Sequence, residues 1–155
     1  MNNVNKTLYI PLYGKSYVSK KGIILHDNKA EEIWEKEGFE LKGKSKSKWL
    51  AYYMGMRAAV FDRWAAAQEG DIVLHIGCGM DSRVVRTGSR NRLWYDVDFP
   101  EVIAERKRYF QETENYHMVP SDIREEAWLS RVPAGKGAII VMEGISMYLQ
   151  PEELK

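Results

Sequence analysis

The sequence is poor in the features of secreted and membrane proteins. It has a single cysteine, Cys78, so it can form neither an internal disulfide bond nor a multi-cysteine zinc site. No apolar run approaches the ~18 residues that a membrane span requires, and the polar segment 1–7 has no signal-peptide core. We therefore expect a soluble, cytoplasmic protein with no membrane contact.

An excess of charge of either sign is also missing. Lys and Arg number 23 and Asp and Glu 22, a formal net charge of +1. Domains that bind nucleic acid through general electrostatics tend to be strongly basic, so a nucleic-acid partner is not expected. Of the 155 residues, 45% are hydrophobic and 12% aromatic, which is enough for a packed core in one domain-sized chain.

The pattern of apolar residues changes near residue 69. Residues 1–69 have helical and loop-like patterns, which predict an N-terminal helical cap or lid. One predicted helix begins at Asp27 or Asn28 and ends at Gly38, and a second spans Trp49–Gln68. In residues 70–155, short apolar runs alternate with helical patterns, which predicts a core of strands and helices.

Four short apolar runs in this core predict strands: Ile72–Ile76, Arg92–Asp98, Asn115–Val119 and Ala138–Glu143. Helical patterns at Pro100–Thr113 and Asp122–Leu129 separate the later runs, so the connections are crossovers and the sheet is parallel. The segment Ile139–Met142 is apolar throughout, as expected of a strand that is covered on both faces. The fold class is therefore α/β with a parallel sheet.

Apolar residues recur at helical spacing in Trp49–Gln68 and predict one buried stripe: Leu50, Tyr53, Met54, Phe61 and Trp64. Arg57 lies seven residues from both ends of this stripe. A guanidinium keeps its charge on burial, and an unpaired buried charge costs several kcal/mol, so Arg57 must bind an anion. That anion is either a carboxylate of this chain or an anionic ligand.

The segment that carries the chemistry is the turn after the first predicted strand, Gly77-Cys78-Gly79. Two glycines permit backbone angles closed to other residues and a close approach of a ligand to the main chain. Asp98 follows Gly77 by 21 residues and ends the second strand, where an acidic residue accepts hydrogen bonds from ribose hydroxyls. The spacing predicts a cofactor that contains a nucleoside.

The residues after the turn favour a cofactor without phosphates. The dinucleotide fingerprint requires a third glycine where this chain has Ser82, and Asp81 would place a negative charge near a pyrophosphate. S-adenosylmethionine fits better, because its ammonium and sulfonium tolerate carboxylates and its own carboxylate can bind a cation such as Arg57.

The chain resembles the leucine carboxyl methyltransferase family, in its branch of bacterial O-methyltransferases linked to polyketide-type small molecules. Besides the helix that bears Arg57, five segments carry the resemblance: Pro11–Lys15, Gly77–Arg83, Asp96–Pro100, Ser121–Asp122 and Glu143–Leu149. The resemblance implies a Rossmann-like class I methyltransferase fold with a parallel sheet of about seven strands, and S-adenosylmethionine as the cofactor.

It also implies roles for single residues. Lys15 and Arg57 would hold the methionine carboxylate of the cofactor, and Gly77 and Gly79 would shape the turn beneath it. Asp98 would bind the ribose. The adenine contacts would come from Asp122, facing the amino group, and from Ile123, beside the ring. Glu143 would lie near the methionine ammonium.

Simpler structural roles compete with several of these assignments. Asp122 can cap a helix that begins at Ile123, and Glu143 can pair with Arg83 or Arg86. Tyr148 lines the acceptor pocket or packs in the core. His75 is expected to be a core histidine with satisfied hydrogen bonds, and no catalytic residue or metal-ligand set stands out.

The sequence thus predicts an O-methyltransferase that aligns a carboxylate or hydroxyl of a small molecule, or a protein C-terminal carboxylate, with the methyl group. A carboxylate acceptor needs no general base near neutral pH. The alternatives are a nicotinamide-dependent oxidoreductase and a non-catalytic nucleoside-binding or interaction module.

Four predicted strands are fewer than the family's sheet contains. We expect the chain to be the N-terminal part of a longer protein or a truncated reading frame, with catalysis by the isolated chain in doubt. A sheet that stops at its fourth strand exposes an edge through which a homodimer can form.

Overall fold

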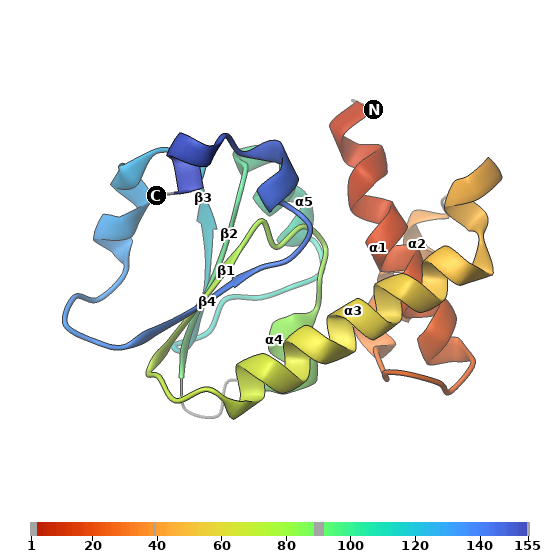
Figure 1. The fold of residues 1–155 in the computed structure, drawn as a ribbon, viewed down its shortest axis with the longest axis horizontal. Helices are drawn as coiled ribbons and strands as arrows, with labels where there is room; N and C mark the ends of the chain where they lie inside the picture. The colour runs from red at the N-terminus through yellow and green to blue at the C-terminus, as the bar shows by residue number, and fades with distance from the viewer. Residues whose placement is uncertain (1–2, 39, 89–91, 155) are drawn as a thin grey trace. The chain divides into compact units, whose positions relative to one another are not determined.

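The computed structural model describes residues 3–38, 40–88 and 92–154. Its residues divide into two compact units (Figure 1). Unit 1 comprises residues 1–66 and 80–88, and unit 2 comprises residues 67–79 and 89–155. The segment that follows the Gly77-Cys78-Gly79 turn therefore groups with the N-terminal helices.

Unit 1 is helical. Its elements are α1 (Asn3–Lys20), α2 (Asn28–Glu37), the 3-10 helix η1 (Gly43–Lys46), α3 (Lys48–Ala67) and α4 (Arg83–Thr87). The predicted caps of α2 are confirmed: the Asp27 side chain accepts a hydrogen bond from the Ala30 N–H, and Gly38 ends the helix in the left-handed conformation. Among the described residues, no helix has the length and apolar character needed to cross a membrane.

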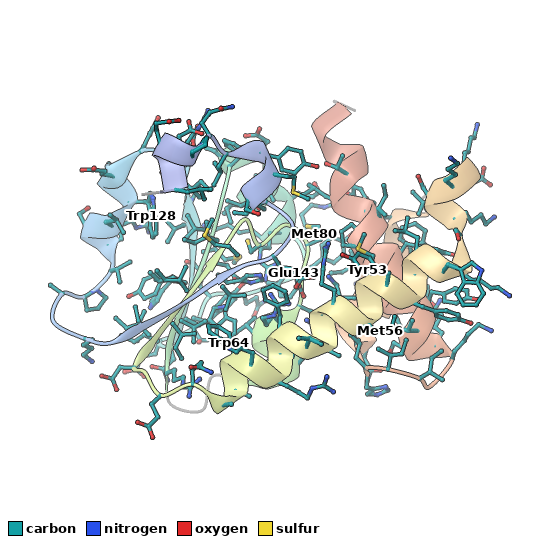
Figure 2. All side chains as sticks on the ribbon, in the orientation of Figure 1. Tyr53, Met56, Trp64, Met80, Trp128 and Glu143 are labelled. Carbon is teal, nitrogen blue, oxygen red and sulfur yellow. The ribbon has the colours of Figure 1, made fainter. Side chains whose placement is uncertain are left out.

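Helix α3 buries its small residues rather than its large ones. Ala51, Gly55 and Ala58 are buried, and a Cβ on Gly55 would lie 2.8 Å from a methyl carbon of Val18 on α1. The predicted apolar stripe is therefore wrong as a core face. Tyr53 and Trp64 are exposed, as are Trp49, Met56 and Val60, and Figure 2 shows Tyr53, Met56 and Trp64 along α3. The close approach of α1 decides which face of α3 is buried.

A network of buried charges ties the helices of unit 1 together. We call it the Asp81 network, and its members are Lys15, Asp27, Asp62, Asp81, Ser82, Arg83 and Arg86. Arg86 Nη1 lies 2.7 Å from both Asp27 Oδ2 and Asp81 Oδ1. Arg86 Nε donates to Asp62 Oδ2, also at 2.7 Å. Three acids therefore face three cations, contributed by α1, α3, the start of α2 and the segment containing α4.

Unit 2 is a parallel sheet with helices. Its strands are β1 (Ile72–Ile76), β2 (Leu93–Asp98), β3 (Tyr116–Pro120) and β4 (Ala138–Met142), in the order β3-β2-β1-β4 with every pair parallel. The other elements are α5 (Pro100–Arg106) and the 3-10 helices η2 (Glu126–Arg131), η3 (Ser146–Tyr148) and η4 (Pro151–Leu154). The predicted α/β, Rossmann-like fold class is confirmed.

Two of the predicted helices of unit 2 are wrong in detail. The helix expected at Pro100–Thr113 ends at Arg106, where the chain turns and the Phe110 N–H donates to the Arg106 carbonyl. The helix expected at Asp122–Leu129 is replaced by a turn followed by η2. Asp122 therefore does not cap a helix that begins at Ile123.

The core of unit 2 buries the side chains of β1 more fully than those of β4. Ile72, Leu74 and Ile76 pack with residues of β2 and β3 and with Trp128 of η2. Ile140 lies beside Leu74 in the register of β4 with β1, but it is 53% exposed. The expectation that both faces of the last strand are covered is therefore wrong for the described residues.

Candidate functional site

A pocket of about 170 Å³ lies at the carboxyl ends of the strands of unit 2. Its lining comes from the segments that follow β1, β3 and β4 and from the end of β2: Gly77, Asp98, Phe99, Ser121, Asp122, Ile123, Arg124, Ile145, Tyr148 and Leu149. Open parallel sheets bind ligands at this edge, at the point where the strand order reverses. In this sheet the order reverses beside β1, because β2 and β3 lie on one side of it and β4 lies on the other. Four predicted cofactor ligands therefore share one pocket, namely Gly77, Asp98, Asp122 and Ile123.

Gly77 requires its lack of a side chain for two structural reasons. Its φ of +66° is rarely adopted by other residues, and a Cβ would lie 2.4 Å from Ile145 Cγ2. The Gly77 N–H donates to the Val97 carbonyl of β2 at 2.8 Å. The turn is thus fixed by backbone hydrogen bonds and packing within unit 2.

Asp98, the predicted ribose ligand, also holds the second glycine of the turn. Its Oδ2 accepts the Gly79 N–H at 2.7 Å, and its Oδ1 accepts the Phe99 N–H at 2.8 Å. Burial raises the pKa of Asp98, although these two backbone donors and Arg106 lower it. Each carboxylate oxygen accepts one of these bonds and has a further lone pair, so Asp98 can still accept the hydroxyl of a ligand.

Asp122 is paired with its neighbour Arg124. Arg124 Nε donates to Asp122 Oδ1 at 2.8 Å, and the Arg124 backbone N–H donates to the same oxygen at 3.0 Å. These bonds hold the pKa of Asp122 at about 2. A carboxylate that stays ionised at this edge of the pocket can accept a hydrogen bond from an amino group.

Behind the turn lies a buried group that we call the Asp96 cluster: Asp96, His75, Trp94, Arg106 and Tyr116. Asp96 Oδ1 lies 3.0 Å from His75 Nδ1 and accepts the Trp94 indole N–H at 2.9 Å. Its Oδ2 accepts bonds from Tyr116 and Arg106. The expected core role of His75 is confirmed, because the residue is 2% exposed and bonded to Asp96.

Comparison with known proteins agrees with this geometry. A family model described as leucine carboxyl methyltransferase matches residues 5–155. The chain belongs to the leucine carboxyl methyltransferase family. This membership confirms the resemblance seen in the sequence.

Two curated proteins of this kind are similar to the chain. Tetracenomycin polyketide synthesis O-methyltransferase TcmP of Streptomyces glaucescens is 30% identical over 156 residues, which cover 97% of this chain and 58% of TcmP. S-adenosyl-L-methionine-dependent methyltransferase dpfgK of Gibberella zeae is 33% identical over 90 residues, 53% of this chain and 30% of dpfgK. The chain spans less than two thirds of the length of either relative.

Gly79, described above, and the other three residues suggested by the family resemblance lie outside this pocket lining. In unit 1, Lys15 is 3% exposed and its Nζ lies 3.3 Å from Asp81 Oδ2. Arg57 is half-buried, with Cζ 5.7 Å from the centre of the Tyr53 ring. In unit 2, Glu143 follows β4 and is half-buried (Figure 2). Their roles in cofactor binding stay predictions.

The structure adds pocket residues to which the sequence analysis gave no role: Phe99, Ser121, Arg124, Ile145 and Leu149. All except Arg124 lie in segments that carry the family resemblance, and all five follow the carboxyl ends of strands, which was the available signal. Tyr148 also lines the pocket and is 72% exposed, so its alternative place in the core is wrong.

Proposed function

We propose that the chain binds S-adenosylmethionine in the pocket of unit 2 and forms part of an O-methyltransferase. The observation that carries this proposal is the meeting of Gly77, Asp98, Asp122 and Ile123 in one pocket. Membership of the leucine carboxyl methyltransferase family and the printed names of TcmP and dpfgK support it. The acceptor we propose is a carboxylate or hydroxyl of a small molecule, or a protein C-terminal carboxylate.

The residues of the pocket fit an adenosine group. Asp98 offers carboxylate lone pairs to ribose hydroxyls, and ionised Asp122 offers an acceptor to the adenine amino group. Ile123 provides an apolar contact for the ring. The guanidinium of Arg124 balances Asp122 in this lining, so charge alone does not choose the cofactor. Ser82, which stands where the dinucleotide fingerprint requires a third glycine, favours S-adenosylmethionine over a nicotinamide dinucleotide.

The sulfonium of the cofactor supplies a methyl group that is already activated toward a nucleophile. The protein then has to bind the cofactor, align the acceptor oxygen and exclude water. A carboxylate acceptor reacts in its ionised form, whereas a hydroxyl acceptor requires a base. The name of TcmP, a polyketide synthesis O-methyltransferase, favours a small-molecule acceptor.

Calorimetric titration of the 155-residue chain tests the proposal. We expect S-adenosylmethionine and S-adenosylhomocysteine to bind and NADH not to bind. Asp98→Asn should weaken S-adenosylhomocysteine binding about tenfold, since it removes a charged acceptor of the ribose hydroxyls. The matched control is Asp71→Asn, an exposed aspartate that precedes β1 at the opposite end of the sheet, and it should leave binding unchanged.

Other outcomes of the titration favour the alternatives. Uptake of NADH would point to an oxidoreductase, and uptake of none of the three compounds would point to an interaction module. Equal loss of affinity in Asp98→Asn and Asp71→Asn would remove the proposed role of Asp98.

A further inference from the structure

Arg106, the last residue of α5, is fully buried beneath the glycine turn of unit 2. Its guanidinium makes a different contact through each nitrogen. Nε donates to the Tyr116 hydroxyl at 3.1 Å, Nη2 donates to Asp96 Oδ2, and Nη1 donates to the Gly79 carbonyl at 3.0 Å. The ring of Phe110 closes the site, with its centre 4.0 Å from Arg106 Cζ. Arg106 thus connects the Asp96 cluster to the turn.

Both backbone polar groups of Gly79 are hydrogen-bonded to side chains. Its carbonyl accepts from Arg106 at 3.0 Å, and its N–H donates to Asp98 Oδ2 at 2.7 Å. Its φ of +50° lies in the left-handed region, where a glycine moves easily between conformations. The two hydrogen bonds select one of these conformations, and that conformation determines where Asp98 Oδ2 is held.

Charge balance with buried Asp96 requires a cation at this position, but it does not explain why the guanidinium also reaches the Gly79 carbonyl. A buried ion pair is often no more stabilising than apolar residues of similar volume, because both charges lose their hydration. Asp96 is already satisfied on Oδ1 by His75 and Trp94 and on Oδ2 by Tyr116. The contact that charge balance does not require is the hydrogen bond from Arg106 Nη1 to the Gly79 carbonyl.

We propose that Arg106 is a positioning residue of the cofactor site, which fixes the Gly79 backbone so that Asp98 presents its remaining lone pairs to the ribose diol. This inference rests on the proposed binding of S-adenosylmethionine. Arg106 itself does not touch the ribose in this role. It acts through Gly79 and Asp98, so its loss should reduce recognition of the diol and leave the other cofactor contacts intact.

The test compares S-adenosylhomocysteine with its 2′,3′-dideoxy analogue, which lacks the two ribose hydroxyls. In the unchanged chain, loss of the diol should weaken binding about tenfold. Arg106→Lys keeps a cation for Asp96, but one ammonium cannot span the positions of three guanidinium nitrogens. We expect this variant to bind S-adenosylhomocysteine about tenfold more weakly and to discriminate between the two compounds by less than about threefold.

Tyr116→Phe is the matched control, because it removes a hydroxyl from Arg106 Nε and Asp96 and leaves the Gly79 contact in place. It should lower the melting temperature yet keep the tenfold discrimination. A purely structural role for Arg106 predicts that both variants lose stability and that both keep the discrimination, and this result would overturn the proposal.

A measurement on the unchanged chain covers the case in which Arg106→Lys does not fold. If Arg106 and Asp98 hold Gly79 before any ligand binds, its amide hydrogen should exchange slowly in the free chain. Exchange at the rate of an exposed amide would overturn the inference.

The failure of the proposed function and the failure of this role can be told apart. If the unchanged chain binds no S-adenosylhomocysteine, the proposed function fails and this role fails with it. If the chain binds the compound and Arg106→Lys keeps full discrimination, only the positioning role is wrong.

Discussion

Each unit of the protein buries a group of charges, but the two groups are built differently. The Asp81 network of unit 1 places three acids against three cations, and most members have more than one partner of opposite charge. The Asp96 cluster of unit 2 depends on one acid, which is hydrogen-bonded to Arg106 and to the side chains of three ring residues. These are His75, Trp94 and Tyr116. In the Asp81 network several acids share the task of balancing the buried cations, whereas in the Asp96 cluster a single carboxylate does so.

The comparison suggests different tasks for the two groups. Helices of unit 1 meet through small residues such as Ala51 and Gly55, and several charged contacts join them at once. In unit 2, the apolar sheet already provides the core, and the Asp96 cluster lies against the glycine turn. A distributed network tolerates the loss of one member better than a cluster built around one residue.

The largest expected effect is that of Asp96→Asn. The substitution removes the ion-pair partner of the fully buried Arg106, and breaking a buried pair in this way costs about 3–5 kcal/mol. Hydrogen exchange of the β1 and β2 amides would measure the loss within unit 2, with exposed Asp71→Asn as the matched control. A loss no larger than that of the control would show that Asp96 is not the centre of its cluster.

Asp62→Asn should have a smaller effect, although it removes the partner of two arginines. Arg86 keeps Asp27 and Asp81, and Arg83 keeps Asp81 at 3.4 Å, so neither cation is left without an acid. We expect a loss of about 1–2 kcal/mol, read from hydrogen exchange of the α3 amides. If Asp62→Asn cost as much as Asp96→Asn, the contrast between a distributed and a concentrated arrangement would be wrong.

Local signals in the sequence were sufficient for much of the fold. Asp27 and Gly38 bound α2 because caps depend on residues close in the chain. The runs that became β1 and β4 are strongly apolar, and both were found within a residue of their observed ends. The positions of Gly77 and Asp98 followed from their spacing, since each comes at the end of a strand.

Contacts between residues that are distant in the chain could not be predicted from local sequence signals. Both sides of α3 carry apolar residues, and the face that is buried depends on the approach of Val18 to Gly55 from another helix. Arg106 lies among the charged residues Glu105, Lys107 and Arg108, a pattern typical of an exposed helix end. The available signal for its burial was Asp96, an acid inside an apolar strand that requires a partner.

The smallest predicted effect is a pH dependence of ligand binding, which distinguishes the two acids of β2, Asp96 and Asp98. Burial raises the pKa of Asp98. Burial also acts to raise the pKa of Asp96, but Arg106 and His75 outweigh it and hold that pKa at about 2. Ribose hydroxyls bind the ionised form of Asp98, so affinity for S-adenosylhomocysteine should fall as the pH drops through the raised pKa of this residue. Asp96 stays ionised across that range and contributes nothing to the change.

Calorimetry of S-adenosylhomocysteine binding over a series of pH values from about 7.5 down to about 5 would measure this dependence, and we expect the affinity to fall steadily. Asp98→Asn removes the titrating group, so its weaker binding should be nearly flat with pH. Asp71→Asn should keep the slope of the unchanged chain, because its side chain is exposed at the other end of β1. A slope that survives in Asp98→Asn would assign the titration to another group and leave Asp98 without its role as the acceptor of the ribose.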